Sequence, residues 1–379
     1  MTPPSPRSFA ATPPPAGAPV PVAALDGLRA VAVVLVLLSH LPSRYFIGGF
    51  VGVDVFFVLS GFLIITTLTR GFQARGRREF ASFYFRRILR LWPPLALCLV
   101  LAWALWDRGA SARPVPDFTL AALAAVFNVA NWRVLVEPDS MWLLSHTWSL
   151  SIEEQFYLVW PLGLWLMLSR KRDPRLILGG IIATLWLVRG AVVLCGLELN
   201  LSRNSLTRMD ALLLGCVLSL LQHGPWLQSR WLRWLQHPAT SVLALVTLVL
   251  ASVFQEEGPV YYAVGIPVIS VAATALIAHG IARRPGRVLR LLEWGPLTFI
   301  GRRSYGLYLY HFPIFFTLNS HRVVPTRSNF ISFSLGALAA TFAVACLSFW
   351  LEEPLLRWGR AWLEGRHRAD SLVGPGVTL

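Results

Sequence analysis

Ten long apolar runs, separated by short and mostly basic loops, constrain this chain more than any other feature. They cover approximately residues 24–41, 48–69, 88–106, 148–168, 176–197, 207–221, 240–254, 260–281, 297–318 and 330–352. Runs of this length fit helices that cross a bilayer, which need about 20 residues. The chain is 55% hydrophobic and only 14% charged, whereas soluble domains carry about 25% charged residues. We therefore predict an all-α polytopic membrane protein with about ten transmembrane helices, and a weaker re-entrant or interfacial segment at 118–132.

The basic residues predict an orientation for these helices. Arginines gather after the second, fourth, sixth, eighth and tenth runs, whereas the loops between are poorer in positive charge or acidic, as at 255–257. Because positively charged loops stay in the cytoplasm, we predict that both termini are cytoplasmic. The net charge of +15 could suggest nucleic acid. However, no basic stripe lies on a soluble fold, so we expect no nucleic-acid partner.

Three segments follow from composition. Residues 1–22 hold eight prolines and no apolar signal core, which predicts a disordered cytoplasmic tail. Residues 23–354 form one transmembrane domain in contact with membrane lipids, and residues 355–379 form a short basic cytoplasmic tail. The four cysteines are far apart, each in an apolar run, with no CxxC pair or metal-ligand spacing. We therefore expect no metal.

The first run, LDGLRAVAVVLVLLSH, carries Arg29 near its start and His40 at its end. Eleven helical steps make three turns plus about 20°, so the two side chains share one face about 16 Å apart. An arginine that reaches the inner interface and a histidine that ends the helix before Pro42 would be an ordinary structural explanation. Alternatively, both line a cavity or pathway, as ionisable groups inside membranes usually do.

A second cluster, FYFRRILRLWPP, places Arg86, Arg87 and Arg90 where all three can crowd one helical face. They could simply anchor the third helix at the inner interface. Alternatively, they form an anion clamp, because a guanidinium pairs with phosphate oxygens in a planar fork that lysine cannot reproduce. A polyanionic cytosolic molecule such as coenzyme A would suit that clamp.

Further polar candidates lie in the outer halves of other runs, or just before them. In the motifs GGFVGVDVFFVLSGFL, HTWSLSIEEQFYLVWP and SYGLYLYHFPIF, they are Asp54, His146, Glu153, Glu154, Tyr308 and His311. Interhelical hydrogen bonds would account for each carboxylate or histidine alone. Together with His40, they predict a water-accessible chamber that opens outward. Gly61, in the middle of the second run, is expected to allow close helix packing.

These motifs resemble the signatures of the acyltransferase-3 family of membrane O-acyltransferases. The resemblance rests on the arginine and histidine of the first run, GGFVGVDVFFVLSGFLI, the pair Arg87 and Arg90, HTWSLSIEEQFYLVWP and SYGLYLYHFPI, in the family's order, with a weak EEPL match near 354. It implies a ten-helix fold in the bacterial cytoplasmic (inner) membrane that moves acyl groups from cytosolic acyl-CoA to a hydroxyl, often on surface or exported carbohydrate. Many relatives carry a C-terminal extracytoplasmic hydrolase-like domain. This chain stops about 25 residues after its last run, so it is similar to the stand-alone type.

The resemblance also implies residue roles. It makes His40 the catalytic histidine with Arg29 as its motif partner, and Arg87 and Arg90 the arginines that handle the donor. From the residues themselves, Arg86 and Arg29 also suit the donor site, and Glu154 or Asp54 could orient the imidazole or the acceptor. The candidate acceptor-binding residues are Glu153, His146, Tyr308 and His311.

The expected reaction is attack of an acceptor hydroxyl on the thioester of acetyl-CoA, the simplest acyl donor, with His40 taking the proton. An acyl-histidine intermediate, or hand-off of the group to a partner protein, is an alternative. Lipopolysaccharide, exopolysaccharide, peptidoglycan and a small secreted glycoside are all compatible acceptors. The alternative class is a transporter of an anionic solute or lipid-linked sugar; against it, the chain shows no internal repeat.

Overall fold

The computed structural model describes residues 22–41, 45–76, 79–106, 116–170, 173–197, 200–222, 229–320 and 330–372. These residues form helices and no strand, as predicted. Apart from Val22, the tail predicted to be disordered lies outside the described residues.

Each predicted run forms one helix or two consecutive helices. They are α1 (Ala23–His40), α2 (Val51–Arg75), α3 (Glu79–Leu105), α6 (Trp148–Ser169), α7 (Pro174–Leu194), α8 (Ser205–Leu221), α10 (Pro238–Phe254), η4 (Tyr261–Gly265) with α11 (Ile266–Ala282), α13 (Gly295–Arg302) with α14 (Ser304–Ser320), and α15 (Phe330–Leu372). Short helices fill the connections: α4 (Phe118–Val126), α5 (Ala130–Val136), η2 (Trp142–Thr147), α9 (Arg230–Leu235) and α12 (Arg287–Leu292). The weaker apolar segment predicted at 118–132 is α4 and the start of α5.

Six of the described helices are long and apolar enough to cross a membrane: α1, α2, α3, α7, η4 with α11, and α15. Of the others, α10 is a shorter apolar helix, α8 and α14 have 17 residues each, and α6 carries two adjacent glutamates in its second turn. The chain is thus a multi-pass membrane protein. The count of ten spans and the orientation stay predictions.

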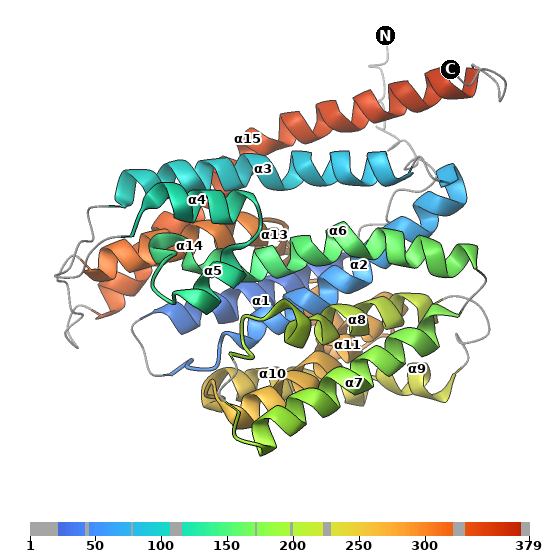
Figure 1. Cartoon of the computed structure of the whole chain (residues 1–379), viewed down its shortest axis with the longest axis horizontal. Helices are drawn as coiled ribbons and strands as arrows, with labels where there is room; N and C mark the ends of the chain where they lie inside the picture. Colours follow the sequence, from blue (N-terminus) through green and yellow to red (C-terminus); the bar gives the residue numbers. More distant parts are fainter. Residues whose placement is uncertain are drawn as a thin grey trace, which may run out of the picture.

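The last helix differs from the sequence prediction. The apolar run was predicted to end at 352, but α15 continues without a break to Leu372 and includes most of the segment predicted as a basic tail. Leucine and arginine are the most frequent residues between Pro354 and the end of α15, and both favour helix. In Figure 1, α15 lies beside α3 along one edge of the molecule, and these two helices are in contact.

Helix α1 lies between two hydrophobic cores. One side of it, including Leu28 and Val36, packs into a core built mainly from α2, α8 and α11. Another side, including Val33 and Leu37, packs into a core built from α3, α4, η2 and α14. Polar side chains on α1 therefore face the boundary between the two halves of the bundle.

Two glycines bring α2 and α8 into close contact. A Cβ atom added at Gly61 would lie 1.8 Å from the carbonyl oxygen of Leu212, and one at Gly215 would lie 2.0 Å from that of Val58. Only residues without a side chain allow backbones to approach this closely. The predicted packing role of Gly61 is confirmed.

Candidate active site

Three histidines from distant parts of the chain meet at the C-terminal end of α1. The ring centroids of His40 and His311 lie 4.9 Å apart, and those of His146 and His311 lie 5.6 Å apart. Phe312 packs edge-on to His40 and stacks on His146. His40 is exposed, whereas His146 and His311 are buried. The cluster therefore joins one exposed histidine to two buried histidines and a partly buried phenylalanine.

Hydrogen bonds assign the proton on two of these rings. The Nδ1 atom of His40 lies 2.9 Å from the carbonyl oxygen of Val36, and that of His311 lies 2.6 Å from the carbonyl oxygen of Tyr308. A carbonyl oxygen only accepts, so in the neutral ring Nδ1 carries the hydrogen and Nε2 carries the lone pair. The Nε2 atom of His311 is buried and has no hydrogen-bond partner among the described residues. His40 thus carries an Nε2 lone pair on an exposed residue.

Tyr308 joins α14 to the start of α6. Its hydroxyl donates to the carbonyl oxygen of His146 at 2.9 Å and lies 2.5 Å from the Ser149 hydroxyl. Because the single tyrosine hydrogen goes to the carbonyl, the Ser149 hydroxyl is the donor in the second contact. Tyr308 therefore fixes η2, and with it His146, against the helix that carries His311.

The predicted donor arginines differ in their partners. Arg87 makes a two-pronged ion pair with Glu154, with its Nε atom 3.0 Å and 3.1 Å from the two carboxylate oxygens. Its guanidinium lies 3.3 Å from the ring centroid of Tyr157. Glu153, next to Glu154, accepts a hydrogen bond from Ser60 at 2.8 Å. The structure thus places Glu154 against Arg87 and not against an imidazole.

Arg90 is the accessible member of the arginine cluster. It is exposed, and no ion pair joins it to a carboxylate within the described ranges. The positive charges of Arg29 and Arg87 interact electrostatically with its guanidinium group. Arg86, by contrast, pairs with Glu79 of its own helix.

Arg29 lies in the second turn of α1 and is held in place by a neighbour. Its Nη1 atom donates to Asp26 at 2.8 Å, and Asp26 also lies 3.4 Å from Arg302 of α13. The Arg29 side chain is 19% exposed. It stands on the same helix as His40, three turns away, and its charge interacts with that of Arg90 on α3.

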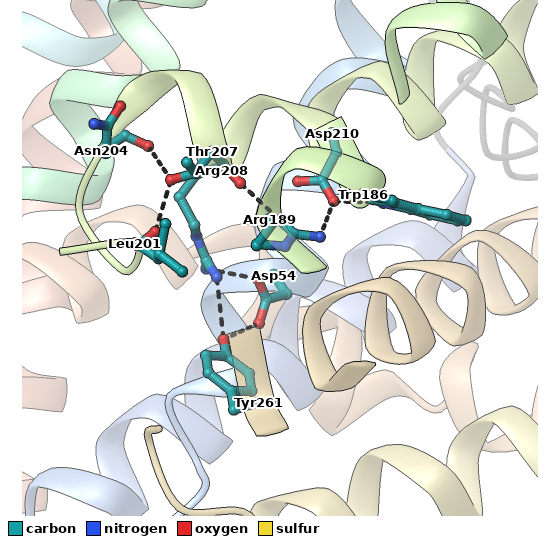
Figure 2. A network of polar contacts seen from close by, with 9 residues as sticks. All are labelled: Asp54, Trp186, Arg189, Leu201, Asn204, Thr207, Arg208, Asp210 and Tyr261. Carbon is teal, nitrogen blue, oxygen red and sulfur yellow. Dashed lines mark hydrogen bonds and ion pairs between the residues drawn. The ribbon is translucent and has the colours of Figure 1, made fainter. Parts of the chain in front are cut away.

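Asp54 belongs to a separate network that is fully buried (Figure 2). One carboxylate oxygen accepts from Arg208 at 2.6 Å and the other from the Tyr261 hydroxyl at 2.6 Å. Beside it, Arg189 pairs with Asp210 at 2.8 Å. Both oxygens of Asp54 are occupied, so the structure places this residue in a link between α2, α8 and η4 rather than beside His40.

The sequence also matches known proteins. A family model described as an acyltransferase domain matches residues 22–352. The chain belongs to the acyltransferase-3 family.

Several members of the acyltransferase-3 family are similar over most of this chain. YrhL of Bacillus subtilis (strain 168) is 37% identical over 314 residues, which are 76% of this chain and 48% of the relative. Peptidoglycan O-acetyltransferase OatA of Listeria monocytogenes is 32% identical over 361 residues, 89% of this chain and 56% of the relative. O-acetyltransferase OatA of Staphylococcus aureus is 31% identical over 363 residues, with shares of 88% and 57%. The chain spans about half the length of these relatives, and no solved structure matches it.

The sequence did not reveal which residues pair with the buried or partly buried charges of this acyltransferase-3 member. Arg189 and Arg208 were not singled out, although each interrupts an apolar run and could have been found by that interruption. Tyr157 and Tyr261 carried no such signal, because a tyrosine in an apolar run is compatible with ordinary packing.

Proposed function

We propose that this protein is a membrane O-acyltransferase that moves an acetyl group from cytosolic acetyl-CoA to a carbohydrate hydroxyl, in the bacterial cytoplasmic membrane with both termini in the cytoplasm. The observation that carries the proposal is the placement of an exposed histidine, His40, on the same helix as Arg29, whose charge interacts with that of Arg90 on α3. Two relatives named as OatA support O-acetyl transfer, and the Listeria name supports peptidoglycan as the acceptor class. The transmembrane domain at 23–354 would carry the activity.

The donor phosphates are expected to bind at Arg90, with Arg29 and Arg87 beside it. A guanidinium without a carboxylate partner can offer its full fork of donors to a phosphate. Arg87 is already paired with Glu154, so its charge is partly neutralised. It would help to hold the arginine cluster in place more than it would neutralise the phosphate charge of the donor. From Arg29, His40 lies about 16 Å along the helix, a length that an extended pantetheine arm can span.

Transfer would then occur at His40. Its Nε2 atom takes the hydrogen of the acceptor hydroxyl while the hydroxyl oxygen forms a bond to the thioester carbon. The carbon–sulfur bond breaks, and the departing CoA sulfur takes the same proton from the imidazolium. Atoms and charge balance without another reactant. The hydrogen bond from Nδ1 to Val36 holds the ring in the tautomer that this step needs.

The first test separates His40 from its neighbour His311. We expect His40→Asn to lower acetyl transfer by a factor of about 10²–10⁴, the usual contribution of a general base, with acetyl-CoA affinity within about twofold of wild type. His311→Asn removes a buried ring whose Nε2 atom faces no described partner, so it should retain more activity. Transfer at the wild-type rate by a folded His40→Asn variant would refute the assignment.

The second test addresses the donor and needs no acceptor. Acetyl-CoA binding to purified protein is measured by calorimetry for wild type, Arg90→Gln and Arg175→Gln. Arg175 is the matched control, because it carries the same charge on α7, next to Asp173. We expect Arg90→Gln to weaken binding about tenfold, corresponding to one charge-assisted contact, and the control to bind as wild type does. Absence of saturable binding to folded wild type would rule out this donor.

A further inference from the structure

A second basic site lies away from the histidines, at the end of the bundle where α1 begins. It is a shallow pocket of about 360 Å³ lined by Arg230, Arg233 and Trp234 of α9, His237 and Arg284. Here α10 begins and α11 ends, and α9 packs against α11. The end of α11 lies beside the start of α1, since a Cβ atom on Gly280 would lie 3.0 Å from that of Ala24. The pocket is therefore on the Arg29 side of the molecule.

The side chains that line this pocket offer hydrogen-bond donors. A guanidinium and an indole N–H donate and do not accept. His237 would normally offer one donor and one acceptor, but its Nδ1 atom accepts from the backbone N–H of Ala239 at 3.2 Å and caps α10. The hydrogen of the neutral ring is therefore on Nε2, which makes the free nitrogen a donor as well. A site with several donors and no side-chain acceptor favours an anion with several oxygens.

The positive charge of the pocket is not neutralised by the part of the chain that the structure describes. None of the three arginines is within ion-pair distance of a described carboxylate. Arg230 and Arg233 are exposed, and Arg284 is partly buried. Three uncompensated guanidinium groups around one pocket would bind an anion more tightly than a neutral or zwitterionic group.

Tryptophans on the same short helix indicate where that anion comes from. Trp231 and Trp234 of α9 are 77% and 53% exposed. Exposed indole rings next to arginines are typical of segments that lie at the headgroup level of a membrane. A lipid headgroup reaches such a position directly from the bilayer, and its upper acyl chains can pack against the indole rings.

We propose that this pocket binds the phosphate headgroup of an anionic phospholipid. The arginines would hold the phosphate oxygens, and the indole rings would lie among the headgroups and upper acyl chains. Such a lipid would connect α9, the start of α10 and the turn after α11. The site is independent of the acetyl-transfer chemistry.

The test compares two double variants that remove the same charge from the same end of the molecule. Arg233→Gln with Arg284→Gln removes two pocket arginines, whereas Arg287→Gln with Arg290→Gln removes two exposed arginines of α12 that do not line the pocket. Native mass spectrometry of each purified protein with phosphatidylglycerol or phosphatidylcholine gives the affinities. Arg230→Gln with Arg233→Gln provides a second pocket variant in which both altered side chains are exposed.

We expect phosphatidylglycerol affinity to fall at least about tenfold in both pocket variants and less than about threefold in the α12 control. Phosphatidylcholine binding should be weak and equal in all proteins. Equal losses in pocket and control variants would overturn the proposal in favour of general surface charge, as would failure of wild type to bind phosphatidylglycerol. Retained lipid binding with reduced acetyl-CoA affinity would instead make the pocket part of the donor site.

Discussion

Replacing Gly61 by alanine tests whether the approach of α2 and α8 holds the bundle together. The added Cβ atom would lie 1.8 Å from the Leu212 carbonyl oxygen and 2.6 Å from its carbonyl carbon. These are backbone atoms, so no side chain can rotate to relieve the contact and the helices must separate. Overpacking of this kind costs about 1–3 kcal/mol, and because the Cβ atom would meet rigid backbone, the cost should lie near the upper end of that range. The higher helix propensity of alanine offsets about 0.5–1 kcal/mol of this loss in stability. The expected net loss is about 2 kcal/mol.

The assay is the apparent melting temperature of the protein in detergent, followed by fluorescence size-exclusion chromatography. A loss of about 2 kcal/mol corresponds to a decrease of about 4 °C or more by the scaling for soluble domains of 150–250 residues. The matched control is Gly180→Ala in α7, where an added Cβ atom meets nothing within 4 Å. That variant should melt at or slightly above the wild-type temperature. If both variants melt alike, the close approach of α2 and α8 does not limit stability and the reasoning is wrong.

Three further predictions concern polar groups. Asp54→Asn leaves Arg208 buried with an uncompensated charge, so it should destabilise the protein by about 3–5 kcal/mol, seen as loss of folded material. Tyr261→Phe removes the hydrogen bond to the same carboxylate and the one from Arg208 but keeps the ion pair, so it should cost less, about 1.5–3 kcal/mol. Equal effects would contradict the ion-pair argument. Tyr308→Phe frees η2 from α14 and should lower acetyl transfer with unchanged acetyl-CoA affinity; a change in affinity alone would argue against its positioning role. Burial lowers the pKa of His146, which lies in η2 outside the six candidate spans, to about 3. Below about pH 6.5 the unfolded chain takes up a proton that the folded protein does not, so stability should fall as pH decreases from 7 to 5. The melting temperature of His146→Asn should fall less over that range, and parallel curves for the two proteins would refute this.

The acyltransferase-3 motifs were accessible from the sequence because each is local. Each motif lies within a single helix, where the helical period fixes which residues share a face. This holds for Arg29 and His40, which are eleven residues apart, for the arginines of α3 and for the glutamates of α6. The apolar runs likewise predicted every long helix, and Gly61 was recognised as a packing position. The continuation of α15 beyond Pro354 was missed because hydropathy ends there, whereas helix propensity does not.

Partners across the bundle were decided only by the tertiary structure. Arg87 and Glu154 are 67 residues apart, and Arg87 was predicted at the inner interface and Glu154 in an outer half of the membrane, yet their side chains pair across the bundle. Asp54 and Arg208 are 154 residues apart, and their pairing removes Asp54 from the surroundings of His40. A charged residue in an apolar run indicates that a partner is needed, because burying a charge without one is energetically costly. Which residue serves as that partner depends on how the helices cross, and no local pattern encodes that.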